Sequence, residues 1–490
     1  MKNIGVFDSL NGNKYIYDGV TNIIVPGNKE LIEVIQNNKE KDRNKIFESA
    51  NPEIRVLMQR WNLFGEPMDM KIDIDFVKQQ MREYPYSQLI LSLTEDCNLR
   101  CKYCIFSGQY EGMRTHSLKE MSLEVALSCV DYFLNMQRDY SKYAPNKNQV
   151  ISFYGGEPLL KFDIIREVVS YAHSRGYKGL FALTTNGTLL NEDRIEYMVT
   201  NNFALSISLD GAKELHDKNR VFKNDIGTHD VVFSNVKKYI NEIDKQGKTD
   251  KLPCTILTCY NTEVDLQVLN NFFIENKEIF NRCFIRANEI KPINNLYGTE
   301  KIHESMKLLA QDYFNSLIEG KTDRDKYFFM ENLFGVSYKM FYARNLAPHA
   351  INYAGKLGGG CIPGSKIFVD TDGQFHACER VNQYFPIGNY KEGINFEKVM
   401  HLMDVWMEAV EEHCSDCPYK SICSGNCLAN CATNDKIDIK PFCKGRRATL
   451  ERILGQLYTI LEKNPQSSLF FTYTKDKQNK KYKNLQMGCD

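Results

Sequence analysis

The sequence of 490 residues lacks a long hydrophobic run and any excess of charge. No apolar stretch approaches the roughly 18 residues of a membrane-spanning helix, and the N-terminal run MKNIGVFDSLNGNKYIYDG has no apolar core of the signal-peptide type. The 62 Lys and Arg residues balance 62 Asp and Glu residues, so no net field attracts polyanions. We therefore expect a cytoplasmic protein with neither membrane nor nucleic acid among its partners.

The 16 cysteines do not indicate a disulfide scaffold. Such scaffolds are usually short and form in oxidising compartments. Cysteines in tight clusters within a cytosolic chain are better explained as metal ligands. The length predicts two to four domains, and the 43% apolar and 25% charged residues are typical of globular proteins.

The most informative motif is CNLRCKYC, which follows the apolar run LILSL. It places Cys97, Cys101 and Cys104 where all three thiolates can reach one small metal cluster. A 4Fe–4S cluster takes four thiolates, so three leave one iron able to bind a chelating small molecule. A zinc site would more naturally use four ligands in two close pairs. The remaining alternative is three unrelated cysteines.

This motif resembles the signature of radical S-adenosylmethionine (SAM) enzymes. The resemblance implies that SAM chelates the open iron and that an electron from the reduced cluster cleaves it. The resulting 5′-deoxyadenosyl radical would remove a hydrogen atom from a substrate, while the protein positions and shields the chemistry. A small electron donor such as flavodoxin or ferredoxin would reduce the cluster. By the same resemblance, Tyr103 would lie along the adenine.

Apolar runs rich in β-formers alternate with helical patterns from residue 86 to residue 290. This alternation predicts parallel βα units, whose sites gather at the C-terminal ends of the strands. The resemblance sharpens the predicted α/β fold to the partial (β/α)6 barrel of radical SAM enzymes. The expected strands are 89–93, 150–154, 180–185, 204–209, 254–259 and 283–287.

A GGEP motif follows the second expected strand and comprises Gly155, Gly156, Glu157 and Pro158. Two glycines allow a backbone to approach a ligand closely, and a carboxylate accepts hydrogen bonds from a protonated amine. In radical SAM enzymes, GGEP at this place binds the amino group of the methionine moiety. Read alone, the motif would indicate only a tight turn.

Polar residues also follow the third and fourth expected strands. The run SISLDG with a following HDKNR resembles a segment of sulfatase and peptide maturases. That resemblance implies that Ser208 contacts the ribose and Arg220 the SAM carboxylate, and an arginine fork suits a carboxylate. Asn186, beyond the third strand, suits the ribose hydroxyls. Asp210 and His216 could instead only cap their loop.

The second group of cysteines lies between residues 361 and 443. Its core, CSDCPYKSICSGNC, resembles the SPASM domain, which carries two further 4Fe–4S clusters and would bring the total to three. The resemblance assigns the first auxiliary cluster to Cys361, Cys378 and Cys427. It assigns the second to Cys414, Cys417, Cys423 and Cys443. The alternative is a pair of structural zinc sites.

The first auxiliary set is one ligand short in this sequence, because CIPGSKIFVDTDGQFHAC lacks an extra cysteine present in some relatives. Its open iron could bind a substrate cysteine thiolate, or Cys431 could fill the gap. Glu379 follows Cys378 where anaerobic sulfatase maturases have an aspartate base, and it could instead form only an ion pair. The cysteines without cluster spacing are expected as buried apolar groups, apart from the tail residue: Cys129, Cys254, Cys259, Cys283 and Cys489.

The expected organisation has five parts. Residues 1–85, with two short strands and two helices, resemble winged-helix-like modules that bind a leader peptide as an added strand; the alternative is an extension that only packs on the barrel. The parts that follow are the barrel (86–290), a helical bridge (291–355), a SPASM domain with two auxiliary clusters (356–447), and a C-terminal helix and tail (448–490).

The sequence thus predicts a radical SAM/SPASM peptide maturase. It would abstract hydrogen from a ribosomally made precursor peptide and install a crosslink, foremost a cysteine thioether. One alternative is an anaerobic sulfatase maturase that forms formylglycine. The other is a catalytically idle iron–sulfur scaffold that only binds peptide.

Overall fold

The computed structural model describes most of the chain. The described residues are 3–37, 42–66, 71–83, 86–110, 112–290, 302–321, 324–344, 346, 361–423, 425, 427–433, 435–443 and 445–468.

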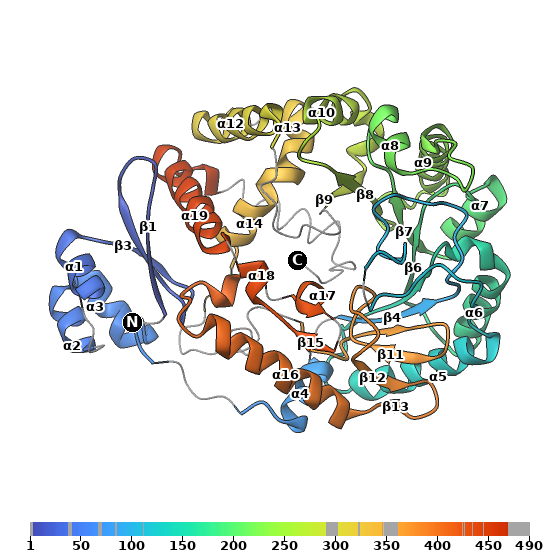
Figure 1. The fold of residues 1–490 in the computed structure, drawn as a ribbon, viewed down its shortest axis with the longest axis horizontal. Helices are drawn as coiled ribbons and strands as arrows, with labels where there is room; N and C mark the ends of the chain where they lie inside the picture. Colours follow the sequence, from blue (N-terminus) through green and yellow to red (C-terminus); the bar gives the residue numbers. More distant parts are fainter. Residues whose placement is uncertain are drawn as a thin grey trace.

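The N-terminal unit is a three-stranded antiparallel sheet followed by three helices (Figure 1). Its elements are β1 (Ile4–Asp8), β2 (Lys14–Asp18), β3 (Ile24–Pro26), α1 (Lys29–Asn37), α2 (Arg43–Ser49) and α3 (Pro52–Trp61). Asn51 caps α3 by accepting from the Ile54 amide at 2.9 Å, a favourable helix start. The unit has its own hydrophobic core, separate from that of the barrel. The two strands expected from the sequence are present, and β1 is an additional one.

A lysine joins the next helix, α4 (Ile74–Glu83), to the barrel. The Lys147 ammonium donates to the Met81 carbonyl and lies 4.7 Å from the centroid of the Tyr140 ring. Burial lowers the pKa of Lys147 to about 8. The ammonium thereby satisfies a carbonyl in the last turn of α4, where a cation is favoured.

The six predicted barrel strands are present, parallel and side by side in sequence order. They are β4 (Tyr86–Ser92), β5 (Asn148–Tyr154), β6 (Leu180–Thr185), β7 (Phe203–Ser208), β8 (Cys254–Tyr260) and β9 (Cys283–Glu289). Helices connect consecutive strands and cover the outer face of the sheet (Figure 1). All six strands therefore end at the same edge, which is where the predicted motifs lie.

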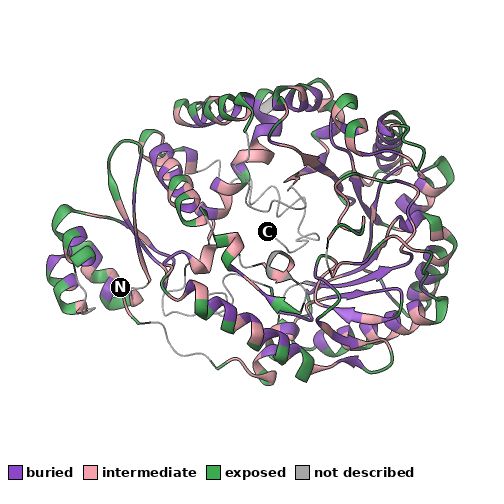
Figure 2. Ribbon diagram, viewed as in Figure 1, coloured by how far each residue is buried: buried purple, intermediate pink, exposed green. Residues whose placement is uncertain are grey.

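The connecting helices bury one face and expose the other (Figure 2). They are α5 (Leu123–Tyr140), α6 (Phe162–Ser174), α7 (Glu192–Thr200), α8 (Lys213–Asn219), α9 (His229–Lys245), α10 (Leu266–Glu275) and α11 (Lys277–Phe280). Helix α5 illustrates how the local sequence starts a helix, because Ser122 caps its first turn by accepting from the Val125 amide at 3.2 Å. The apolar spacing of three and four that predicted these helices corresponds to their buried faces.

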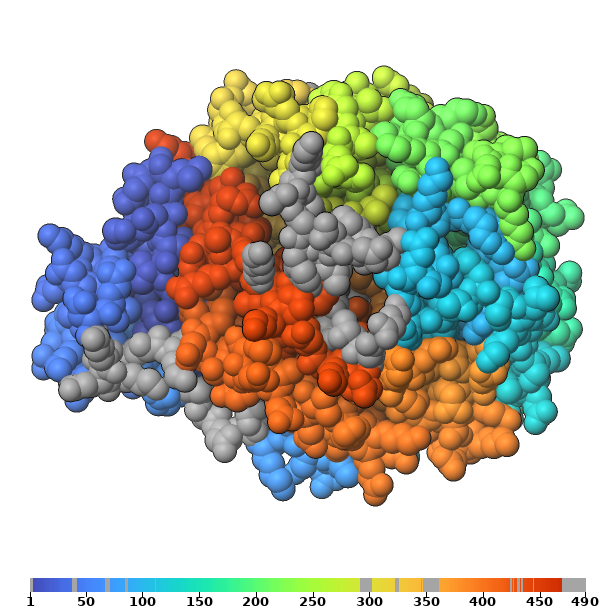
Figure 3. Space-filling view, in the orientation of Figure 1, coloured from blue at the N-terminus to red at the C-terminus, as the bar shows by residue number. Residues whose placement is uncertain are grey.

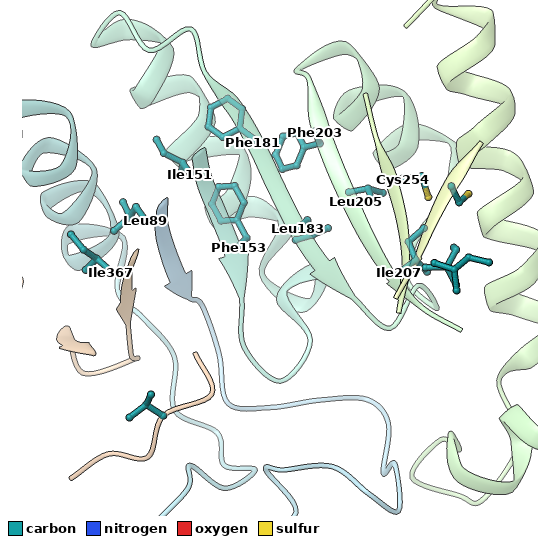
Figure 4. Packing of buried hydrophobic residues seen from close by; sticks show 14 of the residues in the cluster. Leu89, Ile151, Phe153, Phe181, Leu183, Phe203, Leu205, Ile207, Cys254 and Ile367 are labelled. Atoms are coloured by element: carbon teal, nitrogen blue, oxygen red, sulfur yellow. The ribbon is translucent and has the colours of Figure 1, made fainter. Parts of the chain in front are cut away.

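Aromatic residues fill the layer between the sheet and its helices. Phe153, Phe181 and Phe203 come from three neighbouring strands and are fully buried; Figure 4 shows them together. The Phe181 and Phe203 ring centroids are 5.3 Å apart and the planes are 22° from parallel. Such offset aromatic pairs add to the stabilisation from apolar burial.

The sheet continues beyond the predicted barrel. Strand β10 (Lys366–Val369) pairs in parallel with β4, and β11 (Gln374–His376), β12 (Pro386–Asn389) and β13 (Gly393–Ile394) follow in antiparallel order, giving ten strands in one sheet. The apolar run KIFV supplies a partner for the otherwise open edge of β4. The sheet is therefore continuous across the boundary that the sequence suggested between barrel and cysteine-rich region.

The described part of the predicted bridge is helical. It contains α12 (Glu304–Glu319), α13 (Arg324–Met330), a π-helical turn (Glu331–Gly335) and α14 (Val336–Tyr342). The C-terminal region contains α16 (Phe396–Cys414), α17 (Leu428–Cys431), β14 (Ala432–Thr433), β15 (Lys436–Ile437), α18 (Lys440–Cys443) and α19 (Arg446–Lys463). No helix of the described segments has both the length and the hydropathy to cross a membrane.

The N-terminal sheet packs against the C-terminal region (Figure 3). Tyr15 donates to Glu462 of α19 at 2.7 Å, and the buried rings of Tyr17 and Tyr419 stack with centroids 5.2 Å apart. A Cβ added to Gly19 would lie only 2.2 Å from the Pro418 carbonyl oxygen. Beginning and end of the described chain thus form one packed region.

Candidate functional site

The loop that carries the first three cysteines leaves the C-terminal end of β4. Its backbone pairs with the loop after α8: the Arg100 amide donates to Val221 at 2.8 Å and the Lys102 amide to Asn219 at 3.0 Å. The Arg100 guanidinium also donates to two carbonyls of its own loop, those of Cys97 and Leu99, each at 2.7 Å. These hydrogen bonds fix the loop conformation without using the cysteine thiols.

The three thiols of this loop gather and attract N–H donors. The Leu99 amide lies 3.4 Å from the Cys97 sulfur and the Phe106 amide 3.4 Å from the Cys104 sulfur. Burial raises the pKa of the Cys97 thiol to about 12, and interaction with Cys101 and Cys104 contributes. Metal binding requires thiolates, and N–H donors to the sulfurs favour that form.

Two side chains supply further donors to the same sulfurs. Asn186 Nδ2 lies 3.8 Å from the Cys97 sulfur, and Arg220 Nη1 lies 3.9 Å from the Cys101 sulfur. Asn186 directly follows β6, and Arg220 directly follows α8. The predicted ligands and two predicted SAM-contacting residues therefore lie together.

The donor set of this loop is three thiols, the type of ligand that an iron–sulfur cluster takes. Among the described residues, no three His, Cys, Asp or Glu side chains converge on one ion position. A cubane is wider than an ion, so its thiolates stand further apart. Three thiols with donors directed at their sulfurs fit a 4Fe–4S cluster that takes its fourth ligand from elsewhere.

The two glycines of the GGEP motif allow β5 to approach the start of the cysteine loop. The Gly156 amide donates to the Thr94 carbonyl at 2.7 Å. A Cβ on Gly156 would lie 2.1 Å from the Asp96 carbonyl oxygen, and one on Gly155, at φ +147°, would lie 2.4 Å from that of Thr94. Any larger residue would displace the cysteine loop.

Glu157 is fully buried and joins the ends of β5 and β6. Its carboxylate accepts from the Thr185 hydroxyl at 2.8 Å, the Asn186 amide at 2.8 Å and the Leu159 amide at 3.1 Å. Burial raises its pKa to about 7 although these donors act in the opposite direction. Pro158 follows at the first position of a 3-10 turn (Pro158–Lys161). The motif thus connects the ends of β5 and β6 beside the cysteines, and it is also a candidate SAM contact.

Asp210, beyond the end of β7, organises the predicted carboxylate and adenine contacts. It accepts from Arg220 Nε at 3.0 Å and from the Tyr103 hydroxyl at 2.5 Å, and the guanidinium lies over the Tyr103 ring at 5.3 Å. Burial alone would lower the pKa of Arg220, but the Asp210 carboxylate outweighs it and holds that pKa well above its ordinary value. Arg220 therefore stays charged and oriented toward Cys101.

His216 acts as the loop cap that the sequence left open as one reading. Its Nδ1 accepts from the Asp210 amide at 3.1 Å, and its Nε2 lies 2.9 Å from the Thr228 hydroxyl, which donates to the Arg220 carbonyl. Because an N–H donates to Nδ1, the proton of the neutral ring is on Nε2. Burial lowers the pKa of His216 to about 2, so it remains neutral. It fixes the loop that positions Arg220.

One residue of this region was not predicted. Cys259, expected as a buried apolar group, is only half-buried at the end of β8, and its amide donates to Asp210 at 2.9 Å. It lines a cavity of about 70 Å³ together with Asp210 and Asn219. Nothing in its spacing distinguished it from Cys254 and Cys283, which are buried as expected. Ser208 lies where predicted, at the end of β7.

The predicted second auxiliary set converges. Burial raises the pKa of Cys414 to about 12, and interactions with Cys417, Cys443 and Cys423 add to it. The Gly425 amide donates to the Cys423 sulfur at 3.3 Å. Cys414, at the end of α16, therefore lies near the other three thiols of the set, which come from residues 417–443.

Two residues of the predicted first auxiliary set lie in segments that are tied together. The segment after Cys378 is joined to the segment after Cys427 by a 3.0 Å bond from Asn382 to the Ala432 carbonyl. Cys361 is exposed. The side chain of Cys431 and all of Cys489 lie outside the described residues.

Glu379 forms the ion pair that the sequence offered as an alternative to a catalytic role. Its carboxylate lies 3.4 Å from the Lys366 ammonium and accepts from the Cys378 thiol at 3.2 Å. The segment that contains Glu379 is tied to the chain that follows the first three cysteines, because the Gln383 amide donates to the Gly112 carbonyl at 3.1 Å. Glu379 therefore lies between the two cysteine groups.

Comparison with known proteins agrees with this geometry. Residues 91–253 match the radical SAM superfamily, a span from the end of β4 to the start of β8. The chain therefore carries a radical SAM domain and is an enzyme of the radical SAM class.

Its relatives place it close to anaerobic sulfatase-maturating enzymes. The cysteine-type anaerobic sulfatase-maturating enzyme of Clostridium novyi (strain NT) is 24% identical over 396 residues, covering 76% of this chain and 96% of the relative. The structure of native anSMEcpe with bound AdoMet is similar, with a TM-score of 0.54, 20% identity, and coverage of 79% of this chain and 100% of that one. The same protein with bound AdoMet and Cp18Cys peptide gives 0.50 and 21%, covering 79% and 99%. These structures share the fold.

Proposed function

We propose that this enzyme abstracts hydrogen from a ribosomally made precursor peptide and forms a cysteine thioether crosslink within it. The observation that carries the proposal is the short first auxiliary set beside Glu379. Cys361, Cys378 and Cys427 provide three thiolates, one fewer than a 4Fe–4S cluster takes. A substrate cysteine could supply the fourth and be held ready for bond formation.

The bound groups would supply the radical chemistry and the protein would direct it. Cys97, Cys101 and Cys104 would hold a 4Fe–4S cluster with SAM, and these groups would supply hydrogen-abstracting chemistry once a flavodoxin- or ferredoxin-like donor has reduced the cluster. Arg220, held by Asp210, would orient the SAM carboxylate, and Tyr103 would lie along the adenine. Glu157, with the backbone of the two glycines, would hold the amino group, and Asn186 and Ser208 the ribose.

We propose three 4Fe–4S clusters, with the second auxiliary cluster held by Cys414, Cys417, Cys423 and Cys443. The support is the mutual interaction of these four thiols. The cysteine-rich region around them would be the SPASM domain that its spacing resembles.

We further propose that the N-terminal unit is a winged-helix-like module that binds the leader segment of the precursor. Strand β3 is an edge of its sheet and has no further strand partner among the described residues, whereas β1 packs on α19. Strand addition at β3 would use main-chain hydrogen bonds, with side-chain pockets giving selectivity. The affinity of leader peptide for the full chain and for a chain lacking residues 1–85 tests this, and equal affinities would contradict it.

A second candidate is formylglycine formation, because the relatives include a cysteine-type sulfatase-maturating enzyme that the chain covers almost completely. Glu379 would then act as the base. Mass spectrometry of the co-expressed precursor distinguishes the two. A thioether removes two hydrogens and leaves a cysteine resistant to alkylation. Formylglycine formation also removes two hydrogens but in addition replaces the cysteine sulfur by oxygen, and that result would overturn the crosslink proposal.

A further inference from the structure

Arg114 lies between the two cysteine groups and belongs to neither. Its guanidinium carbon is 4.2 Å from the centroid of the Phe368 ring and 5.1 Å from that of Phe106. Phe106 follows the last cysteine of the first group by two residues, and one Arg114 nitrogen donates to the carbonyl of Glu379 at 2.6 Å. The guanidinium therefore lies between Phe106, beside the first cysteine group, and the segment that carries Cys378 and Glu379.

The charge of Arg114 is buried and incompletely paired. Only 4% of the residue is exposed, and within the described segments no carboxylate forms an ion pair with it and its Nη1 has no hydrogen-bond acceptor. A buried donor without an acceptor costs about 1–3 kcal/mol, and more when charged. Such groups are uncommon in folded proteins and point to a partner that joins later.

The neighbouring carboxylates are each engaged elsewhere. Asp370 lies 2.9 Å from His376 Nε2, Glu379 pairs with Lys366, and Glu95 accepts from the Ser117 hydroxyl at 2.6 Å. These carboxylates attract the Arg114 cation at longer range and so lower the free-energy cost of burying it. None of them accepts a hydrogen bond from Nη1. Nη1 is thus a buried donor without an acceptor among the described residues.

We propose that Nη1 of Arg114 donates to a backbone carbonyl oxygen of the substrate peptide and holds the attacked residue between the first cysteine group and Cys378. This assignment rests on the proposed peptide substrate. A carbonyl suits the site because Phe106 and Phe368 flank the guanidinium and leave its edge for hydrogen bonding. A charge-assisted bond of this kind is stronger than a neutral one.

The effect of replacing Arg114 on the stability of the peptide-free protein distinguishes a structural role from a role in binding. If Arg114 served only to tie its loop to Glu379, its removal would destabilise the protein without peptide. If it is kept for the ligand, replacing the incompletely paired cation by an apolar chain of similar length removes the cost of burying the charge, and this gain offsets the lost hydrogen bond to the Glu379 carbonyl. Arg194 is a control for stability alone, since its guanidinium also lies over a ring, that of Phe162 at 5.0 Å, and donates to a backbone carbonyl, that of Leu189 at 2.9 Å.

The test compares Arg114→Met, Arg114→Lys and Arg194→Met in the full chain. Urea unfolding without peptide should give Arg114→Met a midpoint equal to or above wild type, while Arg194→Met falls below it. The second measurement uses the shortest synthetic cysteine-containing peptide that the wild-type enzyme consumes. Arg114→Met should raise its KM about tenfold or more and increase the 5′-deoxyadenosine released per peptide modified, with partial rescue in Arg114→Lys.

Two results would overturn the assignment: a midpoint for Arg114→Met that falls as far as that of Arg194→Met, or an unchanged KM and product ratio. If the wild-type enzyme modifies no peptide, the proposed function fails. In that case, the urea midpoint of Arg114→Met, compared with those of wild type and Arg194→Met, still shows whether Arg114 stabilises the protein.

Discussion

Replacing Tyr17 should release the N-terminal unit from the rest of the enzyme. This residue has no exposed surface. Its ring stacks on Tyr419, and its hydroxyl donates to Asn22 Oδ1 at 2.6 Å and lies 2.9 Å from the Ser421 hydroxyl. Tyr419 and Ser421 belong to the turn between Cys417 and Cys423, so the unit rests on a predicted cluster loop.

The magnitude follows from these contacts. Tyr17→Phe keeps the stacked ring and removes only the hydroxyl. Ser421 still donates to Asn22 at 2.8 Å, so the loss should be about 1 kcal/mol. Tyr17→Ala removes the whole ring from a buried site and should cost about 3–5 kcal/mol. At about 1.4 kcal/mol for each factor of ten, opening of the interface should rise at least a hundredfold.

Hydrogen exchange and limited proteolysis measure this opening. In Tyr17→Ala, peptides from residues 3–37 should exchange faster than in wild type, with a smaller effect in Tyr17→Phe. The control is Tyr239→Phe, which removes a buried hydroxyl that donates to the Phe203 carbonyl at 2.8 Å inside the barrel. Unchanged exchange of the N-terminal peptides in Tyr17→Ala would refute the argument that this stack holds the unit.

Three further predictions follow from the site and the core. Anaerobic reconstitution should give about 12 irons per chain, as for three 4Fe–4S clusters; zinc without visible absorbance would contradict this. Because burial lowers the pKa of Lys147 to about 8, the unfolded chain binds more protons above that pH. Stability should therefore rise between about pH 8 and 10; urea unfolding should show this rise in wild type and not in Lys147→Met, and an equal rise in both would contradict it. If Glu379 is the base of formylglycine formation, Glu379→Gln should abolish that product while SAM cleavage persists; product at the wild-type rate would leave Glu379 only its ion pair with Lys366.

The sequence predicted the barrel well because its strands are short apolar runs separated by amphipathic helices. All six runs are strands, and the motifs lie at their C-terminal ends. Adjacent motifs such as CNLRCKYC and GGEP were also informative, since each places its groups through local backbone geometry. These features depend on residues close together in the sequence.

Features that depend on distant segments were not predictable. Pairing of β10 with β4 joins segments over 250 residues apart, and no periodicity reveals it. The same holds for Cys259, whose position beside Asp210 depends on β7 and β8 being neighbours. Arg114 carried no motif at all, and only its burial without an acceptor distinguishes it. The sequence also left two readings of His216, which its hydrogen bonds to Asp210 and Thr228 resolve as a loop cap.

The most direct test of the account is the fate of SAM in the anaerobically reconstituted enzyme. With a chemical reductant, the wild-type protein should release 5′-deoxyadenosine and methionine in equal amounts. The variant with Cys97, Cys101 and Cys104 all changed to alanine should release neither, while keeping about two-thirds of the iron on the remaining cysteines. Continued release of 5′-deoxyadenosine by this variant, or its absence from the iron-loaded wild type, would contradict the assignment of these three thiols as the catalytic centre.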